Sequence, residues 1–337
     1  GAVEEQSRAR VRSASLLGLA YACSIGGVST LVGTAPNAVF ARMAGSMANR
    51  EIGFGAWMMV GVPFVLLALP TAWWLVTAVA LPLPSSVKET LPRPEKPDWA
   101  PGEPAVMAVL LLCFVAWLTR SPIHLDLGSW VGWGSWMPKK VDDSWVAISA
   151  TLLLFLLPRP KGLATVVEQD HGDDASEARF LLSWRRLSRK MPWSVLLLLG
   201  GGFAMAEAIE VTKLTDWLGS HTADIAGLPG PLAVLIICVG VSFMSAFTSN
   251  TATTQVALPL LAAAAKAADV DPLLWMVPGT IAASCDFTMA VGTPPNAIAS
   301  EAGGVSAGDM FFAGLFLNVA CALLATGVVL VMVPWIW

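Results

Sequence analysis

Long stretches without a charged residue follow one another along the chain. A transmembrane helix needs about 20 consecutive, mostly apolar residues, and several of these stretches reach that length. The uncharged stretches are 13–41, 52–87, 104–119, 144–158, 191–206, 225–265, 272–300 and 310–337, and 272–300 is interrupted only by Asp286. The pattern predicts an all-α polytopic membrane protein.

One uncharged stretch, 225–265, is too long for a single membrane-crossing helix. Polar residues divide it, so we expect a helical hairpin whose tip carries Ser249, Asn250 and Thr251. The hydroxyl groups around this tip are costly in a membrane unless they have partners. Bonds between helices and a helix start capped by Ser249 are the structural explanations. A binding site is the functional one.

Composition supports a membrane protein and excludes other classes. The hydrophobic share is 55% and the charged share 13%, about half of the roughly 25% in soluble domains. A net charge of -4 provides no basic field for nucleic acid. The five cysteines form no CxxC motif, which argues against a disulfide framework or a zinc site. Lys and Arg are more frequent on one side, which predicts that the N-terminus lies inside.

A seven-residue motif occurs twice. Residues 32–38 read VGTAPNA and residues 291–297 read VGTPPNA, so six of seven positions are identical. Counting the predicted membrane spans between the copies makes them run in opposite directions. Inverted repeats with helices broken at matching positions are the sequence pattern of secondary transporters, and the breaks mark the binding site.

The residue types of the motif suit ion and anion binding. Proline removes a backbone donor and disfavours helix at the residue before it, so we expect 34–37 and 293–296 to be unwound and their carbonyl groups to be free. Carbonyl, hydroxyl and amide oxygens suit an alkali cation, while amide hydrogens and helix N-termini suit a carboxylate. The structural alternative is that Thr34 and Thr293 bond back to their own helices.

Ser249-Asn250-Thr251, followed downstream by Gly292-Thr293-Pro294-Pro295-Asn296, resembles the divalent anion:sodium symporter family, which contains di- and tricarboxylate and sulfate carriers. The likeness extends over nearly the whole chain. It implies an elevator-type transporter, in which a transport domain with a re-entrant hairpin and two broken helices slides against a dimeric scaffold.

The resemblance also implies roles for individual residues, with sodium as the co-transported ion. Gly33 and Thr34 correspond to the first broken helix and one sodium site, and Gly292 corresponds to a sodium-coordinating carbonyl of the other. The implied substrate contacts are Ser249, Asn250, Thr251, Thr293, Pro294 and Thr34, and the implied sodium contacts are Gly33, Thr34, Ser245, Thr248, Asn250 and Gly292.

Two features depart from the family pattern. The family has two Ser-Asn-Thr hairpins and this chain has one, so we expect an N-terminally truncated piece, with a single-hairpin transporter as the alternative. The second departure is Asp286, where relatives carry a small or apolar residue. A carboxylate within a span is a functional candidate, here as a proton or cation partner. The alternative is a side chain that reaches water or a neighbouring hydroxyl group.

The predicted domains follow from these elements. Residues 1–52 form the first broken helix of the transport domain, 53–190 form scaffold helices, a linker and interfacial helices, 191–309 contain a glycine-rich span, the hairpin and the second broken helix, and 310–337 form the last transmembrane helix.

The predicted function is sodium-coupled transport of a divalent oxyanion, with a C4-dicarboxylate such as succinate, malate or fumarate as the first candidate. A sulfate or citrate carrier, a dicarboxylate exchanger and proton coupling stay open. We expect a homodimer in a plasma membrane, with a bacterial inner membrane as the setting. An intramembrane hydrolase is the rival from another class, but the chain has no HExxH motif and no enzyme activity is expected.

Overall fold

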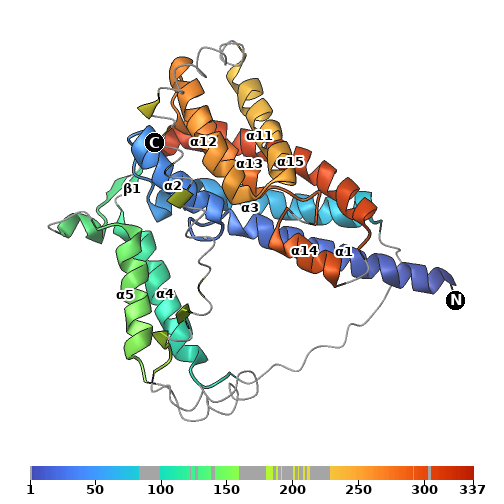
Figure 1. Cartoon of the computed structure of the whole chain (residues 1–337), viewed down its shortest axis with the longest axis horizontal. Helices are drawn as coiled ribbons and strands as arrows, with labels where there is room; N and C mark the ends of the chain where they lie inside the picture. Colours follow the sequence, from blue (N-terminus) through green and yellow to red (C-terminus); the bar gives the residue numbers. More distant parts are fainter. Residues whose placement is uncertain are drawn as a thin grey trace. The chain divides into compact units, whose positions relative to one another are not determined.

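The structure is a computed structural model and is mainly helical (Figure 1). It describes residues 2–82, 99–121, 123–125, 128–137, 141–158, 180–184, 187–188, 191, 200–201, 204, 208, 211–212, 228–290, 292–302 and 305–337. Most of the predicted glycine-rich span lies outside these residues. Within them, four helices are long and apolar enough to cross a membrane, namely Phe54–Ala80, Glu103–Arg120, Gly230–Phe247 and Ala307–Ile336. This confirms the prediction of a polytopic membrane protein.

The chain forms two compact units. The larger unit comprises Gly1–Ile52, Ala56–Lys88 and Val195–Trp337, and the smaller one comprises Gly53–Gly55 and Glu89–Ser194. The domain boundaries and the orientation predicted from the sequence stay predictions.

The larger unit contains the repeated motif and the hairpin. Its described helices are α1 (Ala2–Gly27), α2 (Ala35–Met47), α3 (Phe54–Trp74) with a π-helical continuation η1 (Leu75–Ala80), α11 (Gly230–Phe247), α12 (Asn250–Ala267), α13 (Leu273–Ser284), α14 (Pro294–Glu301) and α15 (Ala307–Ile336). Helix α13 is buried over most of its length, and α11, α12, α15 and α2 all pack against it. The described part of the long uncharged stretch 225–265 therefore forms two helices joined by a short tip, as predicted.

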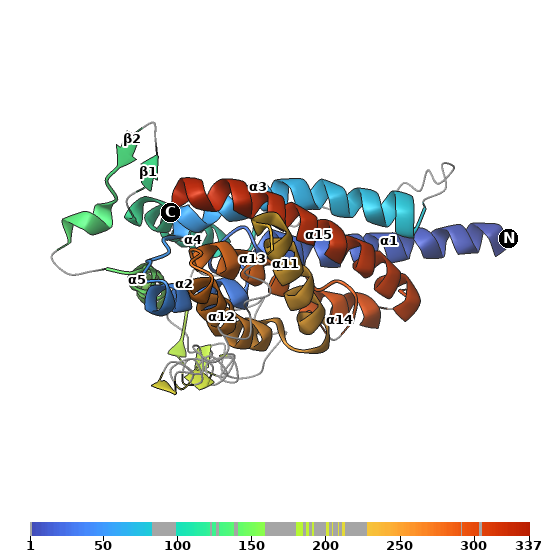
Figure 2. The same ribbon diagram turned by 90° about the horizontal axis from the view of Figure 1, so that it is seen from above.

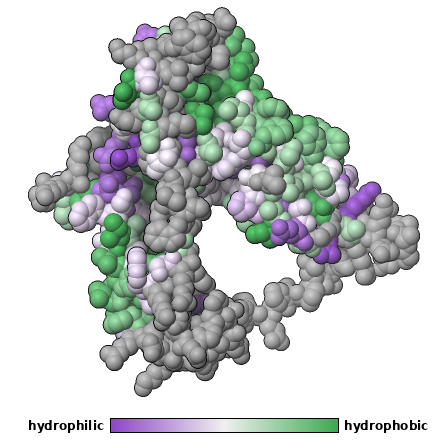
Figure 3. Space-filling view, in the orientation of Figure 1, coloured by the Kyte–Doolittle hydropathy of each residue, from purple (hydrophilic) through white to green (hydrophobic). Residues whose placement is uncertain are grey.

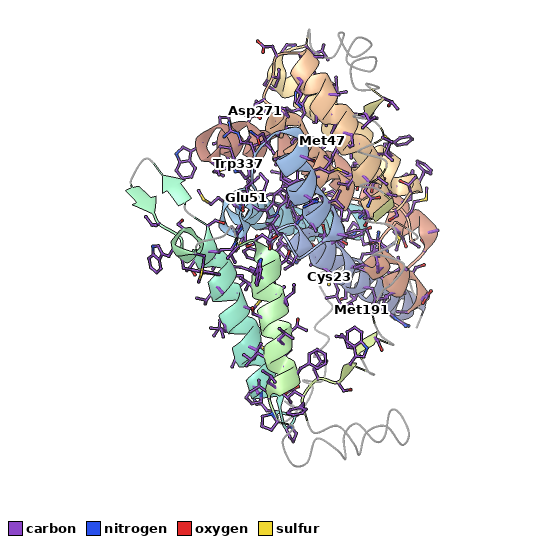
Figure 4. All side chains as sticks on the ribbon, turned by 60° about the vertical axis from the view of Figure 1, so that its left-hand side comes forward. Cys23, Met47, Glu51, Met191, Asp271 and Trp337 are labelled. Carbon is purple, nitrogen blue, oxygen red and sulfur yellow. The ribbon has the colours of Figure 1, made fainter. Side chains whose placement is uncertain are left out.

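The two broken helices pack on each other in a crossed manner. Helix α14 lies beside α1, and α2 lies beside α13 (Figures 1 and 2). The first part of each broken helix therefore packs against the second part of the other. The chain end reaches the same unit, because Arg50 Nη1 donates to the carbonyl of Trp337 at 2.9 Å. Figure 4 labels Trp337 and Glu51 at this end.

The outer faces of α11 and α15 are hydrophobic (Figure 3). Their exposed large apolar side chains are Leu232, Ile236, Val239, Phe243, Phe247, Phe311, Phe312, Leu315, Phe316, Val319 and Leu323. A large exposed apolar patch marks a surface that contacts another protein or a membrane. In a membrane protein, such a face suits contact with lipid.

The smaller unit pairs α4 (Glu103–Arg120) with α5 (Asp143–Leu156). Arg120 is buried and joins the ends of the helices, with Nε 2.6 Å from Asp143 Oδ1 and Nη1 donating to the carbonyl of Val141. Between them lie an antiparallel pair, β1 (Ile123–Leu125) with β2 (Gly128–Trp130), and the turn η2 (Trp133–Trp136). This short pair is an exception to the predicted all-α class.

Candidate functional site

Each copy of the repeated motif covers the end of an irregular segment and the start of the helix that follows it. The first segment, 28–34, separates α1 from α2, and the second, 285–293, separates α13 from α14. Each segment, together with the last residue of the helix before it and the first turn of the helix after it, is called a break, the first break and the second break in chain order. The sequence therefore predicted both broken helices.

The predicted register of the breaks is wrong. Residues 34–37 and 293–296 were expected to be unwound, but α2 begins at Ala35 and α14 at Pro294, so only Thr34 and Thr293 precede the helices. The prolines occupy the first turn, where a backbone N–H has no intrahelical partner and proline's fixed φ suits the helix. The prolines therefore start the second helix of each pair, and the irregular backbone lies before them.

Asn37 closes the first break. Its Nδ2 donates to the carbonyl of Thr30 at 2.7 Å, and those of Gly27 and Val28 lie at 3.4 Å. These acceptors assign Nδ2 to the side of the amide group that faces the break carbonyls. Oδ1 therefore faces away from them. This oxygen is buried and has no hydrogen-bond partner among the described residues. The carbonyl groups of Gly27, Val28 and Thr30 are thus occupied by the motif itself, and they lie outside residues 34–37, whose carbonyls were expected to be free.

Asn296 closes the second break in the same way. Its Nδ2 donates to the carbonyls of Asp286 and Met289 at 3.2 and 3.1 Å. The acceptors lie ten and seven residues before the asparagine, the same offsets as those of Gly27 and Thr30 from Asn37. Oδ1 of Asn296 is also buried without a partner in the described part of the chain. The two motifs therefore have the same local hydrogen-bonding scheme.

An aromatic side chain donates to one carbonyl in each break. Trp57 Nε1 donates to the carbonyl of Val28 at 2.9 Å, and the hydroxyl of Tyr21 donates to the carbonyl of Phe287 at 3.0 Å. Val28 and Phe287 occupy equivalent positions, 259 residues apart. The rings of Tyr21 and Phe287 also meet edge to face, with centroids 5.1 Å apart. A residue of α1 thereby fixes the second break.

The hairpin docks on the C-terminal end of α13. Ser242 Oγ donates to the carbonyl of Cys285 at 2.9 Å. Ser245 Oγ lies 2.7 Å from both the carbonyl of Ala283 and Oδ1 of Asn250, and its single proton serves one of them at a time. The hairpin tip and the start of the second break are therefore one connected polar region.

The first motif reaches the same region. Thr34 Oγ1 lies within hydrogen-bonding distance of Ser284 Oγ, at 3.1 Å, across 250 residues of sequence. Helix α2 packs against both α12 and α13. The structure thus brings Thr34, Ser245 and Asn250 together around the end of α13.

Other predicted site residues show no such convergence. Ser249 is exposed at the start of α12 and makes no side-chain cap bond, and Thr251 is half-buried. Pro294 is exposed at the start of α14. Oγ1 of Thr293 accepts the N–H of Asn296 at 3.4 Å. The back-bonding alternative thus describes Thr293, while Thr34 makes no such cap.

Thr248 and Gly33 lie at the edges of the region. The hydroxyl of Thr248 donates to the carbonyl of Met244 and contacts the hydroxyl of Thr253 across the hairpin tip. Gly33 is exposed in the first break. A methyl group at Gly33 would collide with the carbonyl oxygen of Gly27, so this close approach requires glycine.

Asp286 lies near the start of the second break, directly after Cys285, and is fully buried. One carboxylate oxygen, Oδ1, accepts from the N–H and the hydroxyl of Thr288 at 3.3 and 3.1 Å. Its other oxygen, Oδ2, has no hydrogen-bond partner among the described residues. A methyl group at Gly292 would collide with Oδ2. A neighbouring hydroxyl group was expected from the sequence as an alternative partner of Asp286. The hydroxyl of Thr288 is such a partner, but it donates only to Oδ1.

Several residues that hold this region together were not predicted from the sequence. Asn37 and Asn296 are identical in the two motif copies, which was a usable signal. Ser242 belongs to the hydroxyl-rich hairpin, another signal. Ser284 and Tyr21, the single tyrosine of the chain, carry no local signal, because their partners lie 250 and 266 residues away.

One pattern associated with enzymes occurs near α15. Residues 304–308 read GVSAG, which matches the Gly-x-Ser-x-Gly pattern of serine hydrolases. Ser306 Oγ accepts the N–H of Asp309 at 3.0 Å and caps the start of α15. The described surroundings of Ser306 therefore give it a structural role. Within the described residues, no group of three His, Cys, Asp or Glu side chains is placed to hold a metal ion.

Comparison with known proteins relates this chain to transporters. The chain is 32% identical to the sodium-dependent dicarboxylate transporter SdcS of Staphylococcus saprophyticus, over 99% of this chain and 61% of that protein. It is 33% identical to the Na(+)/dicarboxylate cotransporter 3 of Rattus norvegicus, over 95% of this chain and 56% of that protein. The chain thus spans about six tenths of the length of these relatives, which are transporters and not enzymes.

A family model described as the sodium:sulfate symporter transmembrane region matches residues 1–337, the whole chain. The chain therefore belongs to this family, the divalent anion:sodium symporters, as its motifs predicted.

Proposed function

We propose that the protein transports a C4-dicarboxylate such as succinate, malate or fumarate across a membrane, coupled to sodium, by alternating access. The observation that carries this proposal is the docking of the hairpin tip on α13 beside the first motif, which gathers neutral hydroxyl, amide and carbonyl groups from three parts of the chain. The names of the relatives support both the ion and the anion class.

Two helix N-termini at this region suit carboxylate groups. Helix α12 begins after Ser249 and α2 after Thr34, and neither helix has a side-chain cap bond. The first N–H groups of an uncapped helix need acceptors and carry a partial positive charge. Because α2 packs against α12, one anion with two carboxylate groups is the ligand that we propose for this pair.

The cation is proposed to bind at the two breaks. Each break holds a buried amide oxygen without a partner among the described residues, on Asn37 and Asn296. Oxygen atoms of this kind suit a hard cation such as sodium. Gly33, Thr34, Ser245, Thr248, Asn250 and Gly292 remain the ligands proposed from the family resemblance.

The matching hydrogen bonds of the two breaks and the crossed packing of α1 with α14 and of α2 with α13 support an inverted repeat. An elevator-type movement, a re-entrant hairpin, a homodimer and a plasma membrane location are proposals from the family resemblance. A sulfate or citrate carrier and a dicarboxylate exchanger are the alternatives.

The test is uptake of labelled succinate by the full-length protein in proteoliposomes, with and without an inward sodium gradient. We expect uptake that follows the gradient and is inhibited by malate and fumarate. Uptake that ignores sodium would refute the coupling, and stronger inhibition by sulfate or citrate would refute the C4 assignment. Uptake that requires a dicarboxylate inside the vesicles would identify an exchanger.

Asn250→Ala tests the hairpin. We expect this variant to lose uptake while its folded yield stays close to wild type, because Asn250 is half-buried and its side-chain oxygen lies 2.7 Å from the hydroxyl of Ser245, within the hairpin itself. Ser242→Ala is the matched control on the other arm of the hairpin. It removes the bond to the carbonyl of Cys285 and is expected to cost about 1 kcal/mol of stability with uptake retained. Full uptake by Asn250→Ala would remove this residue from the site.

A further inference from the structure

The two breaks differ in charge. Asp286 lies in the second break, and its equivalent in the first break, 259 residues earlier, is Gly27. The backbone carbonyls of both residues serve the same role, because each accepts the amide N–H of the motif asparagine. The side chain is therefore an addition to a shared framework, and it places a carboxylate in one of two otherwise similar breaks.

The carboxylate of Asp286 is not compensated by the described protein. Its side chain is fully buried, and the bonds to Thr288 engage only Oδ1. The described residues give Oδ2 no donor. Asp286 also follows the C-terminal end of α13, where the helix dipole disfavours a negative charge. A buried charge in this setting is strongly unfavourable without a counter-charge.

The second break offers two buried oxygens without partners. Besides Oδ2 of Asp286, Oδ1 of Asn296 is unpaired among the described residues. Nδ2 of Asn296 donates to the carbonyl of Asp286 at 3.2 Å, so both side chains belong to the same short segment. A carboxylate and an amide oxygen are acceptors only, and hard cations prefer such ligands.

Gly292 makes room for this carboxylate. Any side chain at position 292 would collide with Oδ2 of Asp286. In the first break, the same approach is made by a backbone oxygen, that of Gly27, against Gly33. Glycine is thus required at position 292 for the carboxylate of Asp286 to occupy its observed position.

We infer that the carboxylate of Asp286 is a direct ligand of the cation in the second break. The inference rests on the proposed sodium coupling and deepens it. The negative charge of Asp286 would balance the positive charge of the cation without a bound anion. The first break has Gly27 at this position and relies on neutral oxygens.

Thermal unfolding of the purified full-length protein, without any anionic substrate, tests this inference. Sodium is titrated against choline at constant ionic strength, for wild type, Asp286→Asn and Asp309→Asn. Asp309 is the matched control, because it lies in the first turn of α15, outside the break.

We expect sodium to raise the unfolding temperature of wild type and of Asp309→Asn equally. Asp286→Asn is expected to unfold at a higher temperature than wild type in choline, because it removes an uncompensated buried charge. Its half-saturating sodium concentration is expected to rise about tenfold or more, since contacts to a charged ligand are stronger than those to a neutral one.

Equal sodium responses of wild type and Asp286→Asn, or no response of wild type, would overturn the inference. If Asp286→Asn fails to fold, Asp286→Ala carries the same test with a smaller side chain. Because no anion is present, the assay is independent of transport. Sodium-independent uptake by wild type would refute the proposed function, whereas an unchanged sodium response of the variant would refute only the role of Asp286.

Discussion

The first and second breaks share a framework and differ in what they add to it. In both, a motif asparagine donates to carbonyl groups at the same sequence offsets, and an aromatic side chain donates to a carbonyl at an equivalent position. The first break uses Thr34 to reach Ser284, whereas the second uses Thr293 to cap its own helix. The second also carries Asp286. The same backbone arrangement can therefore carry two sites that differ in charge and in whether the threonine contacts a distant residue or its own helix.

The largest expected effect comes from removing the shared framework. Asn37→Ala and Asn296→Ala each remove the side-chain donor of the hydrogen bonds that hold a break, at about 1–1.5 kcal/mol for each bond lost. We expect both variants to unfold at clearly lower temperature and to lose succinate uptake. A strong effect of one substitution with a negligible effect of the other would contradict the equivalence of the breaks.

The next effect separates a side-chain contact from a backbone contact. Gly292→Ala places a methyl group against Oδ2 of Asp286, and Gly33→Ala places one against the carbonyl oxygen of Gly27. We expect each to destabilise the protein by about 1–3 kcal/mol through overpacking. Adding Asp286→Ala is expected to restore the stability of Gly292→Ala and not that of Gly33→Ala, as measured by thermal unfolding. The same lack of rescue in both cases would show that Asp286 does not occupy this space.

The smallest effect distinguishes the two threonines. Thr293→Val removes a helix cap, which typically costs about 1 kcal/mol, and is expected to lower the unfolding temperature. Thr34→Val removes the contact with Ser284 and is expected to lower succinate uptake more than it lowers stability. Thermal unfolding and initial uptake rates, measured on both variants, provide the comparison. Identical profiles would contradict the assignment of Thr34 to the site and of Thr293 to its helix.

Much of this arrangement was predictable because it is local. The uncharged stretches predicted the helices, the polar residues near Ser249 predicted the hairpin, and the repeated motif predicted both breaks. Asp286 was singled out because it is the one charged residue in 272–300. In each case, the signal lies within a few residues of the feature.

The rest depends on contacts between distant segments. The bonds of Tyr21 to Phe287 and of Thr34 to Ser284 join residues more than 200 positions apart, and no pattern along the chain indicates them. The register of the breaks was missed because proline was taken to unwind the helix, whereas here it begins one. The packing of Gly292 against Asp286 likewise required coordinates.

The central claim is that a cation and a dicarboxylate move together. The most direct measurement follows labelled sodium and labelled succinate simultaneously in proteoliposomes that contain the full-length protein. The account predicts that each flux depends on the presence of the other substrate and that both fall together in Asn250→Ala. Succinate flux that is unaffected by removal of sodium, with no sodium flux when succinate is added, would contradict it.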